Sequence, residues 1–378
     1  MTPTKAVLAG WCTVVLVAGT AAAAVHHDSS PSSRARQATA STAASSTTTT
    51  TTPPPPPRVL FSTRAIDDNA TTTHSIDLSG SDERPEPLAP VQQGQVSPDG
   101  TRVVFDRTNG RQFSNCGFAG CSTSTTLSGD IVIANRDGSD EQMITNGGYN
   151  RSPRWSSKDV IAFIAHLEDA QHIEHDVIEL IRASGITVGA VPEQPQTAPE
   201  DPEFSPDGNR LAYLLASTQT VSRTLHIYDL VAGTDQALAS GELSDLSWSP
   251  DGTQIAAVRK HTTDWPNPDE LVVIPTDGEP VRVVYAAGLP APTKDHYVCG
   301  GSQEEYAIFG EPFWSRDGTT IAFLHNLDHI KFDGAVLDIA LINADGSNLR
   351  TLRPTAPAEC NGPNGSMNYE TVQLLGWT

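Results

Sequence analysis

The sequence predicts an all-β fold, a six-bladed β-propeller of four-stranded antiparallel blades, and three observations support this prediction. A Ser-Pro-Asp-Gly turn recurs along the chain. A short apolar run of strand-forming residues follows each turn. A second pair of such runs, joined by a turn that contains Gly, completes each repeat. Four antiparallel strands that recur in this way are typical of propeller blades.

The recurring turn is clearest in the sequence Trp-Ser-Pro-Asp-Gly at residues 248–252. Ser at the first turn position, Pro with its preset φ at the second and Gly at the fourth suit a type I turn followed by a left-handed residue. Such a turn joins two antiparallel strands. Complete or altered copies lie at residues 96–100, 155–159, 204–208 and 314–318, and Trp377 and Thr378 end the chain as a truncated copy.

The strand after each turn is apolar at almost every position rather than at alternate positions. This pattern fits a sheet that neighbouring blades cover on both faces. The strands are expected at residues 103–105, 160–165, 211–215, 255–258 and 321–324. Small residues in four of them let adjacent sheets approach closely: Ala162, Ala212, Ala256 and Ala322.

The second half of each repeat follows a variable loop. In one repeat, the runs at residues 130–134 and 142–145 flank a turn at Asp137-Gly138. Equivalent turns are expected at residues 184–185, 232–233, 277–278 and 345–346. Each repeat therefore supplies two hairpins, which form one blade.

The repeats resemble those of the TolB-like propellers, which are also called WD40-like or PD40 repeats. The resemblance is carried by aromatic-Ser-Pro-Asp-Gly, then Ile-Ala-Phe, then Asn-Ala-Asp-Gly-Ser-Asn before a Leu. It extends from about Arg58 to Thr378 and implies the propeller fold. It does not specify a function, because one fold carries many functions.

The chain begins with an apolar segment and a linker. Residues 1–25 are interpreted as a signal peptide or a membrane anchor, since a run of about 20 apolar residues can span a membrane and the small residues at 21–24 suit signal cleavage. Residues 26–57 are rich in Ser, Thr, Ala and Pro and predict a disordered linker. Residues 58–378 are assigned to the propeller. Either interpretation of the first segment predicts an exported, extracytoplasmic protein that is membrane-anchored or secreted.

The first blade lacks an opening strand of its own. Its other strands are expected near residues 59–62, 75–78 and 87–91. We expect the missing strand at residues 371–377, so that the C-terminal strand closes the ring. Closure removes the exposed sheet edges that an open array would have.

The chain is strongly acidic, with 24 Lys and Arg residues against 45 Asp and Glu residues and a formal net charge of −21. Without Lys5, Arg34, Arg36 and Asp28, residues 58–378 carry 21 against 44, or −23. Such a field disfavours nucleic acid and anionic membrane surfaces as partners. The sequence predicts a protein or peptide partner with a basic patch, or a small envelope ligand, and membrane contact only through the N-terminal segment.

Of five cysteines, Cys12 is interpreted as an ordinary residue of the N-terminal apolar run. The other four form an even set, which predicts disulfides in an exported chain. Of the three possible pairings we favour Cys116 with Cys121, inside one loop, and Cys299 with Cys360, beside the last blade. A zinc site of four thiolates is the alternative, although the sequence lacks C-x-x-C spacings.

Loop lengths predict which face of the propeller binds. The turns between the first and second strands and between the third and fourth strands lie on one face, and these are all short. The remaining loops lie on the opposite face, the long-loop face, at residues 107–129, 166–175, 259–269, 286–310, 325–335 and 353–370. Long loops on a rigid scaffold present functional groups, although plain insertions are tolerated there too. The candidate binding residues are Trp265, Asp264, Asp269, Tyr297, Tyr306, His325 and His329.

Histidines and carboxylates gather in the loop at residues 166–175. No known ligand spacing is present, so a solvated polar loop is favoured over a metal site, and no cofactor is predicted. A smaller group at residues 325–333 has side chains suited to acid–base catalysis. The weak metal candidates are His166, His172 and His175, beside Glu168, Glu174 and Asp176.

Familiar catalytic motifs are absent from the sequence. It has no G-x-S-x-G elbow, P-loop, dinucleotide fingerprint, H-E-x-x-H or EF-hand loop, and no catalytic residue is assigned. The favoured function is a monomeric, non-enzymatic binding scaffold of the cell envelope or secreted space. The alternative is a secreted lyase or hydrolase with a His and carboxylate site at the propeller mouth, because some enzymes with similar repeats bind a metal there.

Overall fold

The computed structural model describes residues 56–65, 71–88, 94–117, 120–168, 174–194, 196–217, 219–261, 269–286, 310–325, 338–354 and 370–377. For residues 65, 108–117, 120–128, 370 and 371 it describes the backbone alone. The chain divides into two units, residues 1–53 and 54–378, and every described residue belongs to the second. The predicted signal or anchor, and the linker up to residue 55, lie outside the described residues.

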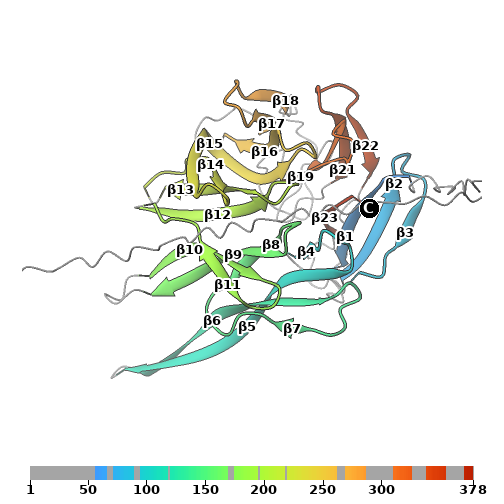
Figure 1. Cartoon of the computed structure of the whole chain (residues 1–378). Helices are drawn as coiled ribbons and strands as arrows, with labels where there is room; N and C mark the ends of the chain where they lie inside the picture. The colour runs from blue at the N-terminus through green and yellow to red at the C-terminus, as the bar shows by residue number, and fades with distance from the viewer. Residues whose placement is uncertain are drawn as a thin grey trace, which may run out of the picture. The chain divides into compact units, whose positions relative to one another are not determined.

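The elements of the described residues are all β-strands, joined by turns and loops, and none of these residues belongs to a helix that could cross a membrane. Four of the five antiparallel sheets have four strands each (Figure 1). The first is ordered β23 (Glu370–Trp377), β1 (Arg58–Ala65), β2 (Thr71–Asp77) and β3 (Glu83–Pro85). The second is ordered β4 (Gln95–Val96), β5 (Arg102–Gly117), β6 (Gly120–Asn135) and β7 (Gln142–Met143). The third contains β8 (Arg151–Trp155), β9 (Val160–Glu168), β10 (Glu174–Arg182) and β11 (Thr187–Ala190), and the fourth contains β19 (Gly310–Trp314), β20 (Thr320–His325), β21 (Asp338–Asn343) and β22 (Arg350–Arg353).

The fifth sheet has seven strands because one long strand belongs to two hairpins. Residues 234–241 of β15 pair with β14, and residues 242–248 of β15 pair with β16. The order is β12 (Thr197–Phe204), β13 (Arg210–Ser217), β14 (Arg223–Asp229), β15 (Thr234–Trp248), β16 (Gln254–Lys260), β17 (Glu270–Pro275) and β18 (Arg282–Ala286). The architecture is an all-β propeller of four-stranded antiparallel blades, as the sequence predicts.

The last strand of the chain pairs with the first described strand. β23 runs antiparallel to β1, from Val59 opposite Trp377 to Ala65 opposite Glu370. The Trp377 indole N–H also donates to the carbonyl oxygen of Phe313 in β19, at 3.1 Å. The predicted completion of the first blade by the C-terminal strand is confirmed, and this strand is tied to a second sheet as well.

A pair of Ser and Asp side chains shapes each Ser-Pro-Asp-Gly or Ser-Arg-Asp-Gly turn. The Ser hydroxyl donates to the Asp carboxylate at 2.6 Å, and the Gly has a φ of 67° to 74°. The same Ser oxygen accepts the N–H that opens the next strand, at 2.9 to 3.0 Å. The Ser hydroxyls beside Asp99 and Asp207 hold the pKa of both carboxyls at about 2. The predicted turn, with a left-handed Gly in fourth position, is confirmed.

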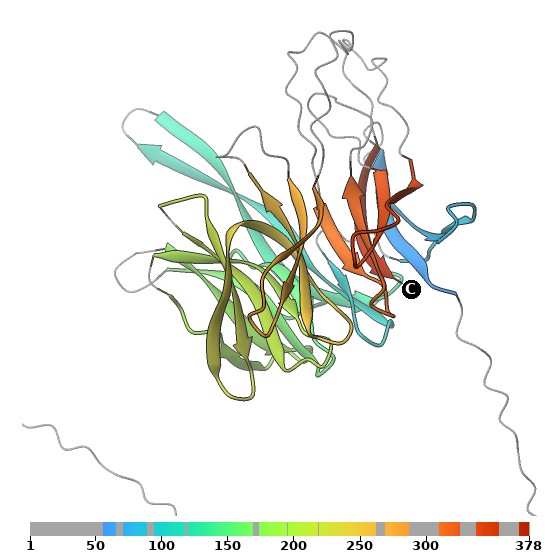
Figure 2. The same cartoon turned by 90° about the horizontal axis from the view of Figure 1, so that it is seen from above.

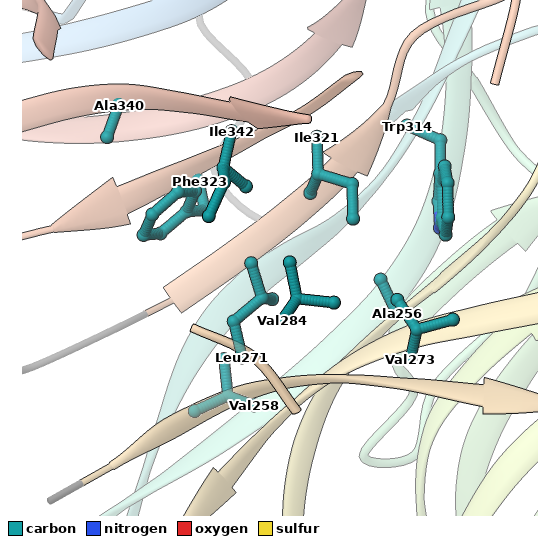
Figure 3. Packing of buried hydrophobic residues seen from close by; sticks show 10 residues of the cluster. All are labelled: Ala256, Val258, Leu271, Val273, Val284, Trp314, Ile321, Phe323, Ala340 and Ile342. Atoms are coloured by element: carbon teal, nitrogen blue, oxygen red, sulfur yellow. The ribbon is translucent and has the colours of Figure 1, made fainter. Parts of the chain in front are cut away.

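The core consists of apolar clusters between neighbouring sheets. β16 illustrates the arrangement, because Ala256 and Val258 pack toward β19–β21, whereas Ile255 and Ala257 pack toward β13 and β14. In Figure 3, the side chains of β16–β18 point toward Phe323 and the other side chains of the next sheet. Burial on both faces explains why these strands are apolar at consecutive positions.

The hairpin of β5 and β6 extends beyond the other strands (Figure 2). Its register is continuous from Arg102 opposite Asn135 to Gly117 opposite Gly120. The predicted loop at residues 107–129 is therefore largely a two-stranded arm. Cys116 lies directly opposite Cys121 in this register, which is the placement that the predicted disulfide needs.

Candidate binding cavity

The first strand of several blades carries a bulge three residues before its aromatic residue. The pairing shifts there in β8, β12, β15 and β19. In each case the bulged residue has a positive φ although it is not Gly: Ser152 at 53°, Asp201 at 47°, Asp245 at 56° and Glu311 at 52°. Bulges redirect side chains, and all four of these residues line one cavity.

This central cavity holds about 450 Å³ and receives residues from every sheet. The strands that contribute to its wall are β1, β4, β8, β12, β15, β19 and β23. The wall also includes Pro98, Gly100 and Arg316, which belong to the tight turns. The cavity therefore reaches the face of those turns, opposite the long-loop face.

Side chains in the cavity connect neighbouring first strands. The Asp201 carboxylate accepts the N–H of Asp245 at 3.2 Å. The Glu311 carboxyl accepts the N–H of Leu374, in the C-terminal strand, at 2.6 Å. On the other side, the amide oxygen of Gln95 accepts the N–H of Trp155 at 2.5 Å. These contacts satisfy backbone N–H groups of strands that border the cavity.

The cavity wall contains four carboxyl groups and three arginines, Arg136, Arg154 and Arg316. Arg154 donates from Nε to Glu203 at 2.7 Å, and the Glu203 side chain is only 21% exposed. The other three carboxyls belong to Asp201, Asp245 and Glu311. Arg154 compensates Glu203, whereas Arg136 lies 4.0 Å from Glu86 and Arg316 belongs to a tight turn. The strands β8, β12, β15 and β19 therefore bring four carboxyls and one arginine to the cavity.

Burial dominates the protonation of these carboxyls. Burial, with a smaller contribution from the nearby Asp245 carboxylate, raises the pKa of Glu311 to about 8. Burial also raises the pKa of Asp245, with a contribution from Asp201. The pKa of Glu203 is raised by burial, although Arg154 opposes this change. A buried carboxyl whose pKa is about 8 still carries its proton at neutral pH.

Comparison with solved structures identifies the fold. TolB from Acinetobacter baumannii superimposes with a TM-score of 0.53 and 14% identity, over 84% of this chain and 66% of that chain. The chain has the TolB β-propeller fold. A TolB candidate from Agrobacterium tumefaciens matches this TolB-like propeller over 84% of the chain and 98% of its own, with 15% identity and a TM-score of 0.50. No protein-family model and no curated protein sequence matches the chain.

Two of the predicted binding residues belong to the described part of this TolB-like propeller. Asp269 precedes β17 and is partly buried, and burial raises its pKa against the opposing effect of Lys260. His325 is only 2% exposed and lies 3.0 Å from the Tyr285 hydroxyl. Its surroundings are those of a core residue. The other predicted binding residues lie outside the described residues: Trp265, Asp264, Tyr297, Tyr306 and His329.

Two of the three histidines proposed as weak metal candidates belong to the described residues, and both have carboxylate partners. His166 lies 2.8 Å from Asp176, and His175 lies 3.7 Å from Glu193. Among the described residues, no group of three or more potential ligands could hold a metal ion. His172 lies outside them, as do Cys299 and Cys360.

The cavity carboxyls were not predicted from the sequence, because long loops are the usual place for binding residues. A signal for them exists, since an acidic residue stands three positions before the aromatic residue in three repeats: Asp201 before Phe204, Asp245 before Trp248, and Glu311 before Trp314. At that spacing an ordinary strand would direct the acidic side chain to the opposite face from the aromatic one. The bulge brings Asp201, Asp245 and Glu311 to the wall of the cavity.

Proposed function

We propose that this chain is an exported, non-enzymatic binding protein whose central cavity receives a basic segment of a protein or peptide partner. The observation that carries the proposal is the cavity of about 450 Å³, with carboxyl groups contributed by three successive first strands. Its volume lies within the range of about 300 to 1,000 Å³ that is usual for ligand sites.

A basic group suits this cavity because buried carboxyls gain from a cation. Arg154 already illustrates such pairing with Glu203. An arginine or lysine side chain that enters near Asp245 and Glu311 would take the place of the proton that Glu311 carries at neutral pH. Paired and hydrogen-bonded charges avoid the desolvation cost that an isolated buried carboxylate has. The net charge of −21 would also accelerate the encounter with a basic partner at low salt.

The remaining features of the proposal concern the setting of the cavity. We propose six blades, with β15 shared between two of them, because the first and second halves of this strand pair with different neighbours. The apolar segment at residues 1–25 would export or anchor the chain. Residues 26–57 would act as a tether that holds the propeller away from a membrane or within a cell wall. The long-loop face, with Trp265 and Tyr297, would be a second contact surface.

A pair of peptides tests the cavity. A fluorescent tetra-arginine peptide should bind the wild-type chain, and the tetra-citrulline peptide, which has the same shape without the charge, should not. Asp245→Asn should weaken arginine peptide binding by about tenfold, because a hydrogen bond to a charged group is worth about 1.5 to 3 kcal/mol. Glu279→Gln removes one exposed carboxylate elsewhere and should leave binding unchanged. Equal binding of both peptides would refute the proposal.

The same peptides compare the two faces. A Trp265→Ala and Tyr297→Ala double variant should retain the binding that Asp245→Asn loses. If the double variant loses binding and Asp245→Asn retains it, the peptide contacts the long-loop face instead. The enzymatic alternative is tested separately by metal analysis of the purified chain, since a stoichiometric, tightly held metal would favour a lyase or hydrolase.

A further inference from the structure

Two adjoining cavities lie between the third sheet and the seven-stranded sheet, away from the central cavity. The smaller has about 160 Å³ and is bordered by His175 and Tyr213, and the larger, more open one has about 370 Å³ and is bordered by His226. Gln194, Thr197 and Leu215 belong to the walls of both, and neither shares a wall residue with the central cavity. Together they form one groove, the blade groove, on the side of the β13–β14 loop.

The blade groove contains a histidine whose orientation is fixed. Asp235 uses both carboxylate oxygens, one 2.8 Å from Nδ1 of His226 and the other accepting the Tyr213 hydroxyl at 2.9 Å. Tyr213 is only 1% exposed, and its ring lies 5.6 Å from the imidazole. The Asp235 carboxylate can only accept, so the tautomer with the proton on Nδ1 fits this contact and leaves Nε2 as a hydrogen-bond acceptor.

The two cavities of the groove differ in charge. The smaller is also bordered by His175, Asp176 and Glu193, of which Asp176 is paired with His166 and Glu193 with His175. Among the described residues that border the larger cavity, the other polar side chains are hydroxyls and one amide, from Gln194, Thr197, Ser217, Thr220, Ser222 and Thr224. No Lys, Arg, Asp or Glu borders it there, in a chain whose net charge is −21. Hydroxyls and amides can both donate and accept, which matches a ligand whose groups do the same. Leu215 adds an apolar surface at the centre of the groove.

We propose that the blade groove binds a short neutral oligosaccharide, with Nε2 of His226 accepting a hydrogen bond from a sugar hydroxyl. The hydroxyl side chains of the β13–β14 loop would bond the remaining sugar hydroxyls, and the C–H face of a sugar ring would pack on Leu215. A charged ligand fits less well, because the larger cavity offers it no ion pair. This site is independent of the basic partner proposed for the central cavity.

The probes are maltotetraose, cellotetraose and tetra-N-acetylchitotetraose, tested against the full chain by saturation-transfer NMR and calorimetry. At least one should bind the wild type at millimolar concentration. His226→Gln should weaken that binding by about tenfold, the cost of one hydrogen bond in a buried site. Thr220→Lys and Ser222→Lys change exposed residues of the groove, so they should block binding without affecting folding.

His74→Gln provides the matched control, because His74 is also paired with a carboxylate, Glu83 at 3.1 Å, but lies in the first sheet. It should bind the sugar as the wild type does. The proposal is overturned if no probe binds the wild type, if the groove variants bind as well as the wild type, or if the control loses binding to the same extent.

Discussion

Replacing Glu311 with glutamine should flatten the pH dependence of the protein's stability. Burial in the central cavity raises the pKa of this carboxyl from the ordinary 4.5 to about 8. In the unfolded chain the same carboxyl loses its proton near the ordinary value. Between these two pH values the folded state holds a proton that the unfolded state has released. Raising the pH therefore favours unfolding.

The size of the effect follows from the two pKa values. One proton of difference lowers the free energy of unfolding by about 1.4 kcal/mol for each pH unit. Between pH 4.5 and about 8, the accumulated loss for Glu311 approaches about 5 kcal/mol. This is an upper limit, because water and side-chain movement relieve part of the burial cost. Glutamine keeps an oxygen for the N–H of Leu374 but has no titrating proton.

Urea unfolding followed by tryptophan fluorescence, between about pH 5 and 8, measures the change. The free energy of unfolding should fall more steeply with pH in the wild type than in Glu311→Gln. The difference between the two slopes should correspond to about one proton, or about 1.4 kcal/mol for each pH unit. Glu279→Gln removes an exposed carboxylate and should run parallel to the wild type. If the wild type and Glu311→Gln also run parallel, the carboxyl does not retain its proton in the folded state, and the account of the cavity is wrong.

Three further predictions concern the scaffold. Deleting β23 should lower the melting temperature and promote association of the chains. The deletion removes buried Leu374, whose loss should cost about 2 to 5 kcal/mol of stability, and it exposes an edge of β1. A deletion variant that stays monomeric and equally heat-stable would contradict this prediction. Gly346→Ala should lower the urea midpoint more than Gly278→Ala. Both glycines have a positive φ, 88° at Gly346 and 86° at Gly278. A Cβ atom at Gly346 would lie 2.7 Å from a carbonyl oxygen of β18, whereas a Cβ atom at Gly278 would meet nothing within 4 Å. Equal midpoints would show that conformation alone, about 1 to 2 kcal/mol, sets the cost. Peptide mapping without reduction should link Cys116 to Cys121, and free thiols at both positions would contradict the disulfide.

The sequence was sufficient to predict the features that depend on neighbouring residues. The Ser-Pro-Asp-Gly turns were predictable because Ser249 bonds Asp251 two residues away, within the turn itself. The apolar runs were predictable because each of these strands is covered on both faces of its sheet, so that consecutive residues are all buried and all apolar. The pairing of β23 with β1 could also be predicted, since the first repeat lacked one strand and the chain end supplied it.

The cavity could not be predicted from the same patterns. Asp245 and Glu311 point into it because the strand bulges there, and a bulge shifts the alternation of side chains by one residue. The extent of β6 was also misjudged, since residues 120–129 read as loop sequence but pair regularly with β5. Ser and Thr in that segment accept either conformation, and pairing with the opposite strand decides between them.

The shared strand β15 gives the central cavity one wall of fixed geometry. Asp201 on β12 and Asp245 on β15 belong to the same seven-stranded sheet, whereas Glu311 on β19 belongs to another. Because β15 passes from one hairpin to the next without a loop, no flexible connection allows the two aspartates to separate. Their repulsion is relieved in part by the hydroxyl of Ser244, which donates to Asp245, and would be relieved further by a proton or by a cation that lies between them. A change of pH or salt should therefore change which proton, water or cation occupies the cavity, while the wall formed by β12 and β15 stays in place.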